Sequence, residues 1–450
     1  MSTKNEVFGY LPDERPPLLG LIFFALQQIV VMFPATVLVA LITGFHVSTT
    51  IFASGLATLG FILITKRQIP LYYGSSFSYI AAIASIMSAE AFAAYSLNDK
   101  ISVAQFGIVM SGFVSILAGY IINKSGKDKI DKVLPATVTG SIAIIIGLSL
   151  AANAMTNAAS FPEAAQNNPY AGSWAWVIAI ITLLSTILYS VYLRGKLSQL
   201  PILFGLLTGY TAALVIGGIT GIPFVSFDTI QTAGVFNLPV FTFPKPTFAA
   251  LVAIMPIAIA TIPESTAHVY QLDIYVNDLA KKKGVNKKYD IENKLGLNLI
   301  GDGIGDIISG AIGGPAGTNY GENISAMAIS KNFSIHVLML AAVLTMVISC
   351  FTPLINIIYS IPTSVIGGLS IYLFGVIGAQ GITIMIDRKV DMFSSKNLAV
   401  IAVILIVGLG GSFGFEGGMI PMFSIEAPAI ASAALVGILL NLILSINEKK

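Results

Sequence analysis

The sequence predicts an all-α polytopic membrane protein with fourteen transmembrane segments, arranged as two inverted repeats of seven. Three observations predict this fold class: the composition, the spacing of apolar runs and the positions of the basic residues. Of 450 residues, 55% are hydrophobic and only 10% are charged, and the mean hydropathy is +0.85. A typical soluble domain carries about 25% charged residues. A water-soluble globule is therefore excluded, and the apolar excess must face lipid.

Apolar runs near the roughly 20 residues that cross a bilayer recur along the whole chain. Two further segments, 75–90 and 322–331, are too short or too polar to cross alone, and each follows a stretch rich in Gly or Pro. We expect twelve full spans, at about residues 19–43, 49–65, 103–123, 134–152, 174–193, 200–219, 248–270, 292–311, 334–352, 362–383, 397–411 and 427–446.

The basic residues test this count, because cytoplasmic loops of membrane proteins are enriched in Lys and Arg. With both short segments counted as crossings and the N-terminus inside, 22 of the 24 basic residues fall on the cytoplasmic side, and only Lys100 and Lys245 fall outside. Omitting the short segments would move the lysine clusters at 124–132 and 281–288 to the wrong side. We therefore predict a multi-pass protein of the cell (plasma or inner) membrane with both termini in the cytoplasm.

The two short segments begin the third and the tenth crossing, which are seven crossings apart. Because seven is odd, two halves of seven would run in opposite directions, as in many secondary transporters. Unwound backbone at membrane depth is tolerated only where protein or a water-filled cavity satisfies it. Gly74, Ser75 and Ser76 can cap the first half-helix, and Thr318, Asn319 and Gly321 the second, so that helix-end amides face a pocket. We expect this pocket to bind a molecule with acceptor oxygens.

Four carboxylates remain inside the predicted spans, and such residues are by default functional candidates. Glu264 lies four residues before His268, so the two share a helical face and can hydrogen-bond. The pair is a candidate proton acceptor and relay, or a satisfied structural pair. Glu322 begins the second half-helix, where the helix dipole favours its anion. It is expected to line the pocket, the alternative being a capping contact alone.

Asp302 and Asp306 are also spaced four apart, among glycines that permit close helix packing. Proton coupling is one interpretation, for which Asp302 is the candidate. A structural role, tying the half-helices in place, is favoured. Phe77 and Tyr320 flank the two broken points and can stack on a flat ring, or serve packing alone.

Several protein classes and ligands are excluded. No basic run is interleaved with aromatics, so nucleic acid is not an expected partner. The single cysteine, Cys350, forbids an intrachain disulfide and a Cys-based metal site. No HExxH motif occurs, and YYGSSFSY has no credible His and Asp partners, so an enzyme is not expected. No cofactor or metal is predicted, and the driving force would be an ion gradient.

Motifs along nearly the full chain resemble the nucleobase/ascorbate transporter family, and within it the bacterial uracil permeases. The motifs are ERPPLL with LQQ, YYGSSFSYIA, PESTAH, GDGIGDIISG, TNYGENISAMAISK and IGGLSIYLFGVIGAQGI. The family pattern in the tenth span is Gln, Glu or Pro, then Asn, any residue, Gly, four residues, Thr, then a basic residue or Gly. Glu322, Asn323 and Lys331 match it, whereas Ser325 and Ser330 replace the Gly and the Thr.

The resemblance implies a core domain of crossings one to four and eight to eleven and a gate domain of the rest. The boundaries are 15–132 and 247–352 for the core, and 133–246 and 353–447 for the gate. It also implies a homodimer through the gate. Uracil permeases commonly have Gln-His in the first span, where this chain has Gln27 and Gln28, so Gln28 replaces a possible member of the proton network.

By the same resemblance the base lies between the third and tenth crossings. Glu264 and Glu322 would bond its polar edge, and His268 would partner Glu264. Backbone amides at Phe77 and Gly321 would contact its carbonyl oxygens. Ser76 and Tyr320 complete the expected binding set, and Asn323, Asp306 and Gln28 are expected to support it.

The function predicted is a proton-coupled importer of a nucleobase, most likely uracil, by elevator-type alternating access. A pyrimidine-2,4-dione presents N–H donors beside carbonyl acceptors, which two carboxylates and helix-end amides complement. The same carboxylates would repel an anionic substrate, which argues against an anion exchanger. The alternative is a permease for xanthine or another purine base, possibly coupled to sodium.

Overall fold

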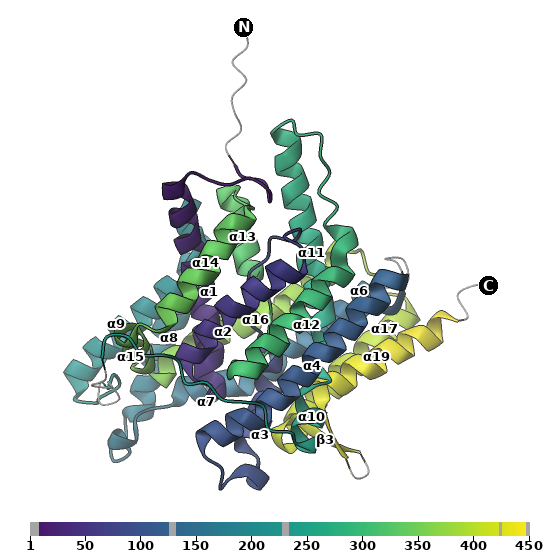
Figure 1. Cartoon of the computed structure of the whole chain (residues 1–450). Helices are drawn as coiled ribbons and strands as arrows, with labels where there is room; N and C mark the ends of the chain where they lie inside the picture. Colours follow the sequence, from purple (N-terminus) through teal and green to yellow (C-terminus); the bar gives the residue numbers. More distant parts are fainter. Residues whose placement is uncertain (1–8, 126–131, 227–233, 423–424, 447–450) are drawn as a thin grey trace. The chain divides into compact units, whose positions relative to one another are not determined.

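A computed structural model describes residues 9–125, 132–226, 234–422 and 425–446 (Figure 1). The chain divides into two compact units. Unit 1 is formed by Met1–Tyr79, Ile86–Lys132 and Val240–Ile348, and unit 2 by Ile80–Ser85, Val133–Pro239 and Ser349–Lys450. Part of the predicted cytoplasmic charge lies outside the described residues, namely Lys4, Lys127, Lys129, Lys449 and Lys450.

Unit 1 is mostly helical and contains the strands β1 and β2, which lie at the two breaks. Helix α3 (Ile80–Ser88) follows η1 directly, and its first residues are assigned to unit 2. The elements of unit 1 are α1 (Leu18–Thr43), α2 (Val47–Ile64), β1 (Tyr73–Ser75), η1 (Phe77–Tyr79), η2 (Glu90–Phe92), α4 (Leu97–Ser125), α10 (Phe248–Ile254), α11 (Ile257–Lys282), η5 (Glu292–Lys294), α12 (Leu295–Ile312), β2 (Gly317–Asn319), α13 (Gly321–Ser330) and α14 (Ile335–Ser349).

Unit 2 consists of helices and one short hairpin. Its elements are α6 (Ala136–Ser149), α7 (Ala151–Ala159), η3 (Glu163–Ala165), α8 (Ala171–Tyr192), η4 (Gly195–Gln199), α9 (Pro201–Thr220), α15 (Thr352–Tyr359), α16 (Thr363–Asp387), α17 (Ser395–Leu405), the π-helical turn η6 (Ile406–Gly410), α18 (Gly411–Gly414), η7 (Glu416–Gly418), β3 (Met419–Met422), β4 (Ile425–Pro428) and α19 (Ala429–Ser445).

Ten helices among the described residues are long and apolar enough to cross a membrane. Three shorter apolar stretches, Phe77–Ser88, Ile335–Ser349 and Ala429–Ser445, add to them. The protein is thus a mostly helical polytopic membrane protein. The count of fourteen crossings and the inverted order of the two halves stay predictions.

The prediction of an all-α fold is wrong in one respect, because the described residues include four short strands. Strands β1 and β2 form one antiparallel pair, and β3 and β4 form another. The first pair joins the two segments that the sequence marked as unwound. Backbone amides buried away from water need partners, and two extended segments that meet can supply them to each other.

Glycines hold α12 close to α4 in unit 1, where the two helices run side by side (Figure 1). A Cβ at Gly303 of α12 would lie 2.8 Å from Ile116 Cγ1 of α4, so a larger residue would push the helices apart. Helix α12 also contacts α2. The acids of α12 are consequently held inside unit 1, between neighbouring helices.

Helix α11 differs from the predicted span 248–270 at both ends. Pro256 lies at the junction between α10 and α11, and α11 then continues to Lys282. Its last turns are polar and include an exposed ion pair between Lys282 and Asp278. A helix can continue from lipid into water without losing its internal hydrogen bonds, which is why the apolar run underestimates its length.

Candidate functional site

The site of unit 1 is built around the strand pair β1–β2. Its register pairs Tyr73 with Asn319, Gly74 with Thr318 and Ser75 with Gly317. The segments continue the pairing on either side, because the Ser76 amide donates to the Ala316 carbonyl and the Tyr320 amide to the Tyr72 carbonyl. The helical segments that follow β1 and β2 therefore both begin next to the same strand pair.

Helix α2 satisfies the outer edge of β1. Ser54 Oγ donates to the Tyr73 carbonyl at 2.7 Å, and the Tyr73 amide donates to Thr58 Oγ1 at 3.1 Å. Two hydroxyls thus replace the strand that would otherwise lie beside β1, and they let extended backbone exist within unit 1.

Tyr320 packs against the strand pair and bonds it. Its hydroxyl donates to the Ser75 carbonyl at 3.0 Å and is 2.9 Å from Thr36 Oγ1 of α1. Its ring covers Gly74, where no Cβ would fit, and the residue is only 3% exposed. The predicted stacking on a ligand stays a prediction, and the contacts of Tyr320 are with the protein.

Asp306 ties both strands to α12. Its Oδ1 accepts from the Tyr73 hydroxyl at 2.5 Å and from the Gly317 amide at 2.8 Å. Ser111 Oγ of α4 donates to Oδ2 at 3.4 Å. A single carboxylate therefore joins β1, β2 and α4, as a structural role requires.

Asp302 holds the segment that precedes α13. Its Oδ1 accepts from Asn319 Nδ2 at 2.7 Å, and its Oδ2 accepts from Ser265 Oγ at 2.7 Å and from Asn298 Nδ2 at 3.0 Å. Ser265 belongs to α11, next to Glu264. Asp302 therefore links α11, α12 and β2, and a change at this carboxylate would reach both helices that carry the site glutamates.

Gln28 fixes α13 to α1. Asn323 Nδ2 donates to Gln28 Oε1 at 2.8 Å and to the Gln28 carbonyl at 3.0 Å. Both residues are buried. The two amides anchor the first turn of α13, the turn that begins with Gly321 and Glu322.

Glu264 and His268 lie on α11, but the predicted hydrogen bond between them is absent. Ser78 Oγ of η1 donates to Glu264 Oε2 at 3.5 Å, and among the described residues no group hydrogen-bonds His268 Nδ1. The imidazole instead bonds a backbone group of Asn319 and faces α13. A Cβ at Gly321 would lie 2.9 Å from His268 Nε2, so a larger residue there would displace the imidazole. The imidazole of His268 therefore bonds the backbone of Asn319 in β2 and not Glu264, although Glu264 and His268 share a helical face.

Helix α13 begins without a side-chain cap, its N-cap residue being Tyr320. The prediction that Thr318 and Asn319 cap this helix is wrong, because both lie in β2 and Asn319 is bound to Asp302. Glu322 occupies the first turn, where the helix dipole favours an anion or acceptor oxygen. The carboxyl groups of Glu322 and Glu264 are close enough to interact electrostatically.

Burial separates the predicted residues into two sets. One set is half-buried, and the other set is buried. The half-buried residues are Phe77, Glu264, His268, Gly321 and Glu322, and the buried ones are Gln28, Ser76, Asp302, Asp306, Tyr320 and Asn323. Ser76 is buried, and its Oγ accepts from the Ser78 amide at 3.3 Å, so its predicted contact with substrate stays a prediction.

The sequence interpretation missed several supporting residues. Asn298 lies four residues before Asp302, and this spacing on the same helical face was a usable signal. Tyr73, Ser78 and Ser265 carried no comparable signal, because their partners are far away in the chain.

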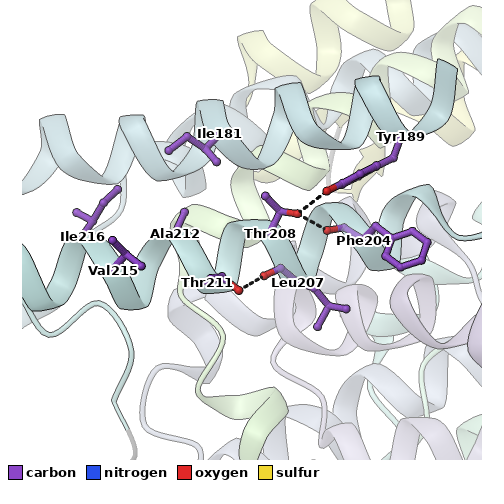
Figure 2. A pocket seen from close by; sticks show the side chains of 9 residues that line it. All are labelled: Ile181, Tyr189, Phe204, Leu207, Thr208, Thr211, Ala212, Val215 and Ile216. Atoms are coloured by element: carbon purple, nitrogen blue, oxygen red, sulfur yellow. Dashed lines mark hydrogen bonds between the residues drawn. The ribbon is translucent and has the colours of Figure 1, made fainter. Parts of the chain in front are cut away.

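An open apolar groove of about 500 Å³ runs between α8 and α9 in unit 2 (Figure 2). Tyr189 and Thr208 meet across it with their oxygens 3.1 Å apart, and Thr208 also donates to the Phe204 carbonyl at 2.8 Å. No acid, base or amide side chain lines the groove. It therefore offers no counterpart to the carboxylates of unit 1.

Apolar spans, two broken segments that meet in a strand pair and half-buried carboxylates beside them define the class: a multi-pass membrane transporter. The chain belongs to the nucleobase/ascorbate transporter family, since residues 19–417 match the sequence profile described as "Permease family". Members of this family are transporters rather than enzymes.

Similar proteins extend over almost the whole chain. It is 36% identical to the uracil permease of Bacillus caldolyticus, over 96% of this chain and 94% of that permease. It is 33% identical to the uracil permease of Bacillus subtilis (strain 168), over 99% and 96%, and 34% identical to that of Escherichia coli (strain K12), over 96% and 92%.

Solved structures share the fold at low identity. The transmembrane domain of the cyanobacterium bicarbonate transporter BicA matches with a TM-score of 0.59 at 16% identity, over 96% of this chain and 98% of that chain. SLC26A9 matches with a TM-score of 0.65 at 13% identity, over 96% of this chain and 66% of that chain. At such identities the likeness concerns the fold alone.

Proposed function

We propose that the protein is a symporter that imports a nucleobase, uracil first, together with protons. The observation that carries the proposal is the position of Glu264 and Glu322, two half-buried carboxyl groups beside the uncapped start of α13. The naming of three similar proteins as uracil permeases supports the choice of base.

The chemistry of this arrangement fits a neutral ring with donors beside acceptors. Carboxylate oxygens accept from ring N–H groups, and the backbone amides at the start of α13 donate to carbonyl oxygens. Gly321 carries no side chain, and this leaves room for the His268 imidazole beside the start of α13. An anion would face two carboxylates at once, so a neutral uracil is favoured over a charged substrate.

Proton coupling is assigned to Glu264, with His268 four residues later on the same helix and Asp302 as a third member. Asp302 and Glu264 are connected through α11, because Ser265 donates to Asp302. Protonation of Glu264 would remove a charge that otherwise repels Glu322. Binding of a proton and binding of a base would then favour each other, which is what symport requires.

Alternating access is assigned to movement of unit 1, as the core, relative to unit 2, as the gate. All the residues of the candidate site belong to unit 1, so an elevator-type movement would carry the site as one body. A homodimer through the gate and a cytoplasmic position of both termini complete the proposal. Mass measurement of the detergent-purified protein and labelling of terminal tags in intact cells test these two points.

Uptake of labelled uracil into proteoliposomes tests the function. We expect accumulation that needs an inward proton gradient, collapses with an uncoupler and does not respond to sodium. Unlabelled uracil should compete strongly, and xanthine, guanine, hypoxanthine and adenine weakly. Strong competition by xanthine would reassign the protein to purines, and uptake that follows a sodium gradient would overturn the proton assignment.

A further inference from the structure

The chain segment before α1 runs across the ends of two site helices. We call residues 9–15 the N-terminal strap. The Tyr10 amide donates to the Lys331 carbonyl at 2.8 Å, and the Phe333 amide donates to the Tyr10 carbonyl at 2.8 Å. Tyr10 and Asn332 thereby form a parallel bridge at the point where α13 ends. The strap is attached by backbone hydrogen bonds to the exit of the second half-helix.

Charged side chains attach the same strap to the end of α11. Lys283 Nζ donates to Glu14 Oε2 at 2.6 Å, to Glu14 Oε1 at 2.8 Å and to the Gly9 carbonyl at 2.9 Å. The Lys283 side chain is only 19% exposed, so this pair is better shielded from solvent than an ordinary surface ion pair.

A second pair lies beside the first. Lys287 Nζ is 2.6 Å from Asp13 Oδ2, and the Tyr289 hydroxyl donates to Asp13 Oδ1. Burial raises the pKa of Asp13, but the hydrogen bonds from Lys287 and Tyr289 outweigh it and hold that pKa below its usual value. Asp13 is therefore ionised at neutral pH, and the pair reinforces the attachment to the segment that follows α11.

Gly9 shows how tightly the strap is held between the two helices. Its φ is +153°, and a Cβ there would lie 2.8 Å from the Lys331 carbonyl oxygen and 2.9 Å from Leu279 Cδ1 of α11. The strap thus contacts α11 on one side and the end of α13 on the other at a single residue.

This attachment matters because α13 is short. It has 10 residues, so its two ends make up much of its length and the groups that hold them set its position. Strand β2, Tyr320 and Asn323 hold its beginning, and the strap holds its exit. The strap also touches α11, the helix of Glu264, so it connects the helices that carry the two site glutamates.

We propose that the N-terminal strap is a clamp that sets the spacing of α11 and α13, with Glu14 and Lys283 as a positioning pair for the site. The proposal rests on the proposed function for its effect on base binding. The pair does not touch the base. It acts by keeping Glu322 of α13 at a fixed position relative to Glu264 of α11.

Single-residue variants of the full-length protein test the clamp. Glu14→Gln and Lys283→Gln break the pair, and Glu14→Lys combined with Lys283→Glu restores it with the charges exchanged. Asp278→Asn and Lys282→Gln are the matched controls, because they remove an ion pair of the same kind at the same helix end that joins α11 only to itself. Asp13→Asn is a second, milder break, used if Glu14→Gln lowers the yield of folded protein.

Two readouts are needed for each variant. Hydrogen–deuterium exchange of peptides covering residues 321–330 reports the clamp directly, with residues 97–125 of α4 as an internal reference. The dissociation constant for uracil, with the thermal midpoint of the same sample, reports the site. A merely structural pair would lower the midpoint and change exchange throughout unit 1.

We expect Glu14→Gln and Lys283→Gln to speed exchange in α13 several-fold, leave α4 unchanged and weaken uracil binding about three- to tenfold. The exchanged-charge variant should recover part of both effects, because it restores the ion pair but not the hydrogen bonds to the Gly9 carbonyl and from the Leu11 amide; the controls should stay within twofold of wild type. Unchanged α13 exchange in both single variants overturns the clamp. If wild-type protein binds no uracil, the proposed function fails, while the exchange measurement still decides on the clamp.

Discussion

Helices α1, α2 and α12 of unit 1 are buried to a much larger extent than helices α8 and α9 of unit 2. In unit 1, 67% of the apolar window of α1 and 61% of those of α2 and α12 are buried, whereas in unit 2 the shares are 28% for α8 and 22% for α9. Many large apolar side chains of α8 and α9 are exposed, among them Leu184, Leu188, Leu207 and Ile219. Helices α8 and α9 therefore leave much of their apolar surface uncovered by the rest of the chain.

The two units also differ in the partners that their polar side chains bond. In unit 1, carboxylates and amides bond across elements, as Asp302 does with Ser265 and Asn319. In unit 2, hydroxyls such as those of Thr182 and Thr211 mostly bond the carbonyl four residues earlier in their own helix. The core around α8 and α9 consists of Ala, Ile, Val and Phe. The contrast teaches that buried carboxylates and amides connect the elements of unit 1, whereas the elements of unit 2 are joined by apolar packing and by hydroxyl pairs such as Tyr210 with Ser360.

The largest expected effect belongs to Glu264. We expect Glu264→Gln to abolish proton-driven accumulation of uracil, because the amide cannot take up and release a proton, while exchange of labelled for unlabelled uracil continues. Proteoliposome uptake with and without a proton gradient measures both. Undiminished accumulation that still collapses with an uncoupler would remove Glu264 from coupling.

Glu322→Ala should weaken uracil binding about ten- to hundredfold. Hydrogen bonds to charged groups contribute roughly 1.5–3 kcal/mol, and each 1.4 kcal/mol is about a factor of ten in the dissociation constant. Isothermal titration of purified protein measures it. Glu322→Gln is the control, since it keeps the size and one acceptor oxygen, and it should bind at an intermediate strength. Unchanged affinity in the alanine variant would place Glu322 outside the site.

Tyr73→Phe tests the strand pair without touching the half-buried residues. It removes the hydrogen bond to Asp306, which we expect to cost roughly 1–2 kcal/mol of stability, together with a severalfold weaker affinity for uracil. Thermal unfolding and titration of the same sample measure the two effects. A stability loss with full affinity would show that the strand pair does not position the site.

The same substitution placed in each unit sharpens the contrast most directly. Thr58→Val leaves the buried Tyr73 amide unpaired, at a cost of roughly 1–3 kcal/mol, so stability and uracil affinity should both fall. Thr208→Val removes a hydroxyl that bonds its own helix and Tyr189 across the groove, and we expect affinity within twofold of wild type. Equal effects in the two variants would contradict the division between a unit that carries the site and a unit that does not.

The sequence predicted many of these features because each depends on local information. Apolar runs located the spans, and Gly and Ser residues located the two breaks near Tyr73 and Gly317. The rarity of acids inside apolar runs identified Glu264, Asp302, Asp306 and Glu322. The hydrogen bond predicted between Glu264 and His268 was wrong, since periodicity gives a shared helical face but does not decide which partner a side chain takes.

Composition and periodicity alone determined that this protein lies in a membrane, that two of its helices are broken and which carboxylates need an explanation. These follow from the energetic cost of placing charge and unpaired backbone in lipid. This cost depends on the residue itself and on its neighbours in the sequence. Only the tertiary structure decided that β1 pairs with β2, that Asp306 and Asp302 hold this pair, and that Glu14 reaches Lys283. Each of these contacts joins residues far apart in the chain, and no local pattern encodes which distant groups will satisfy one another.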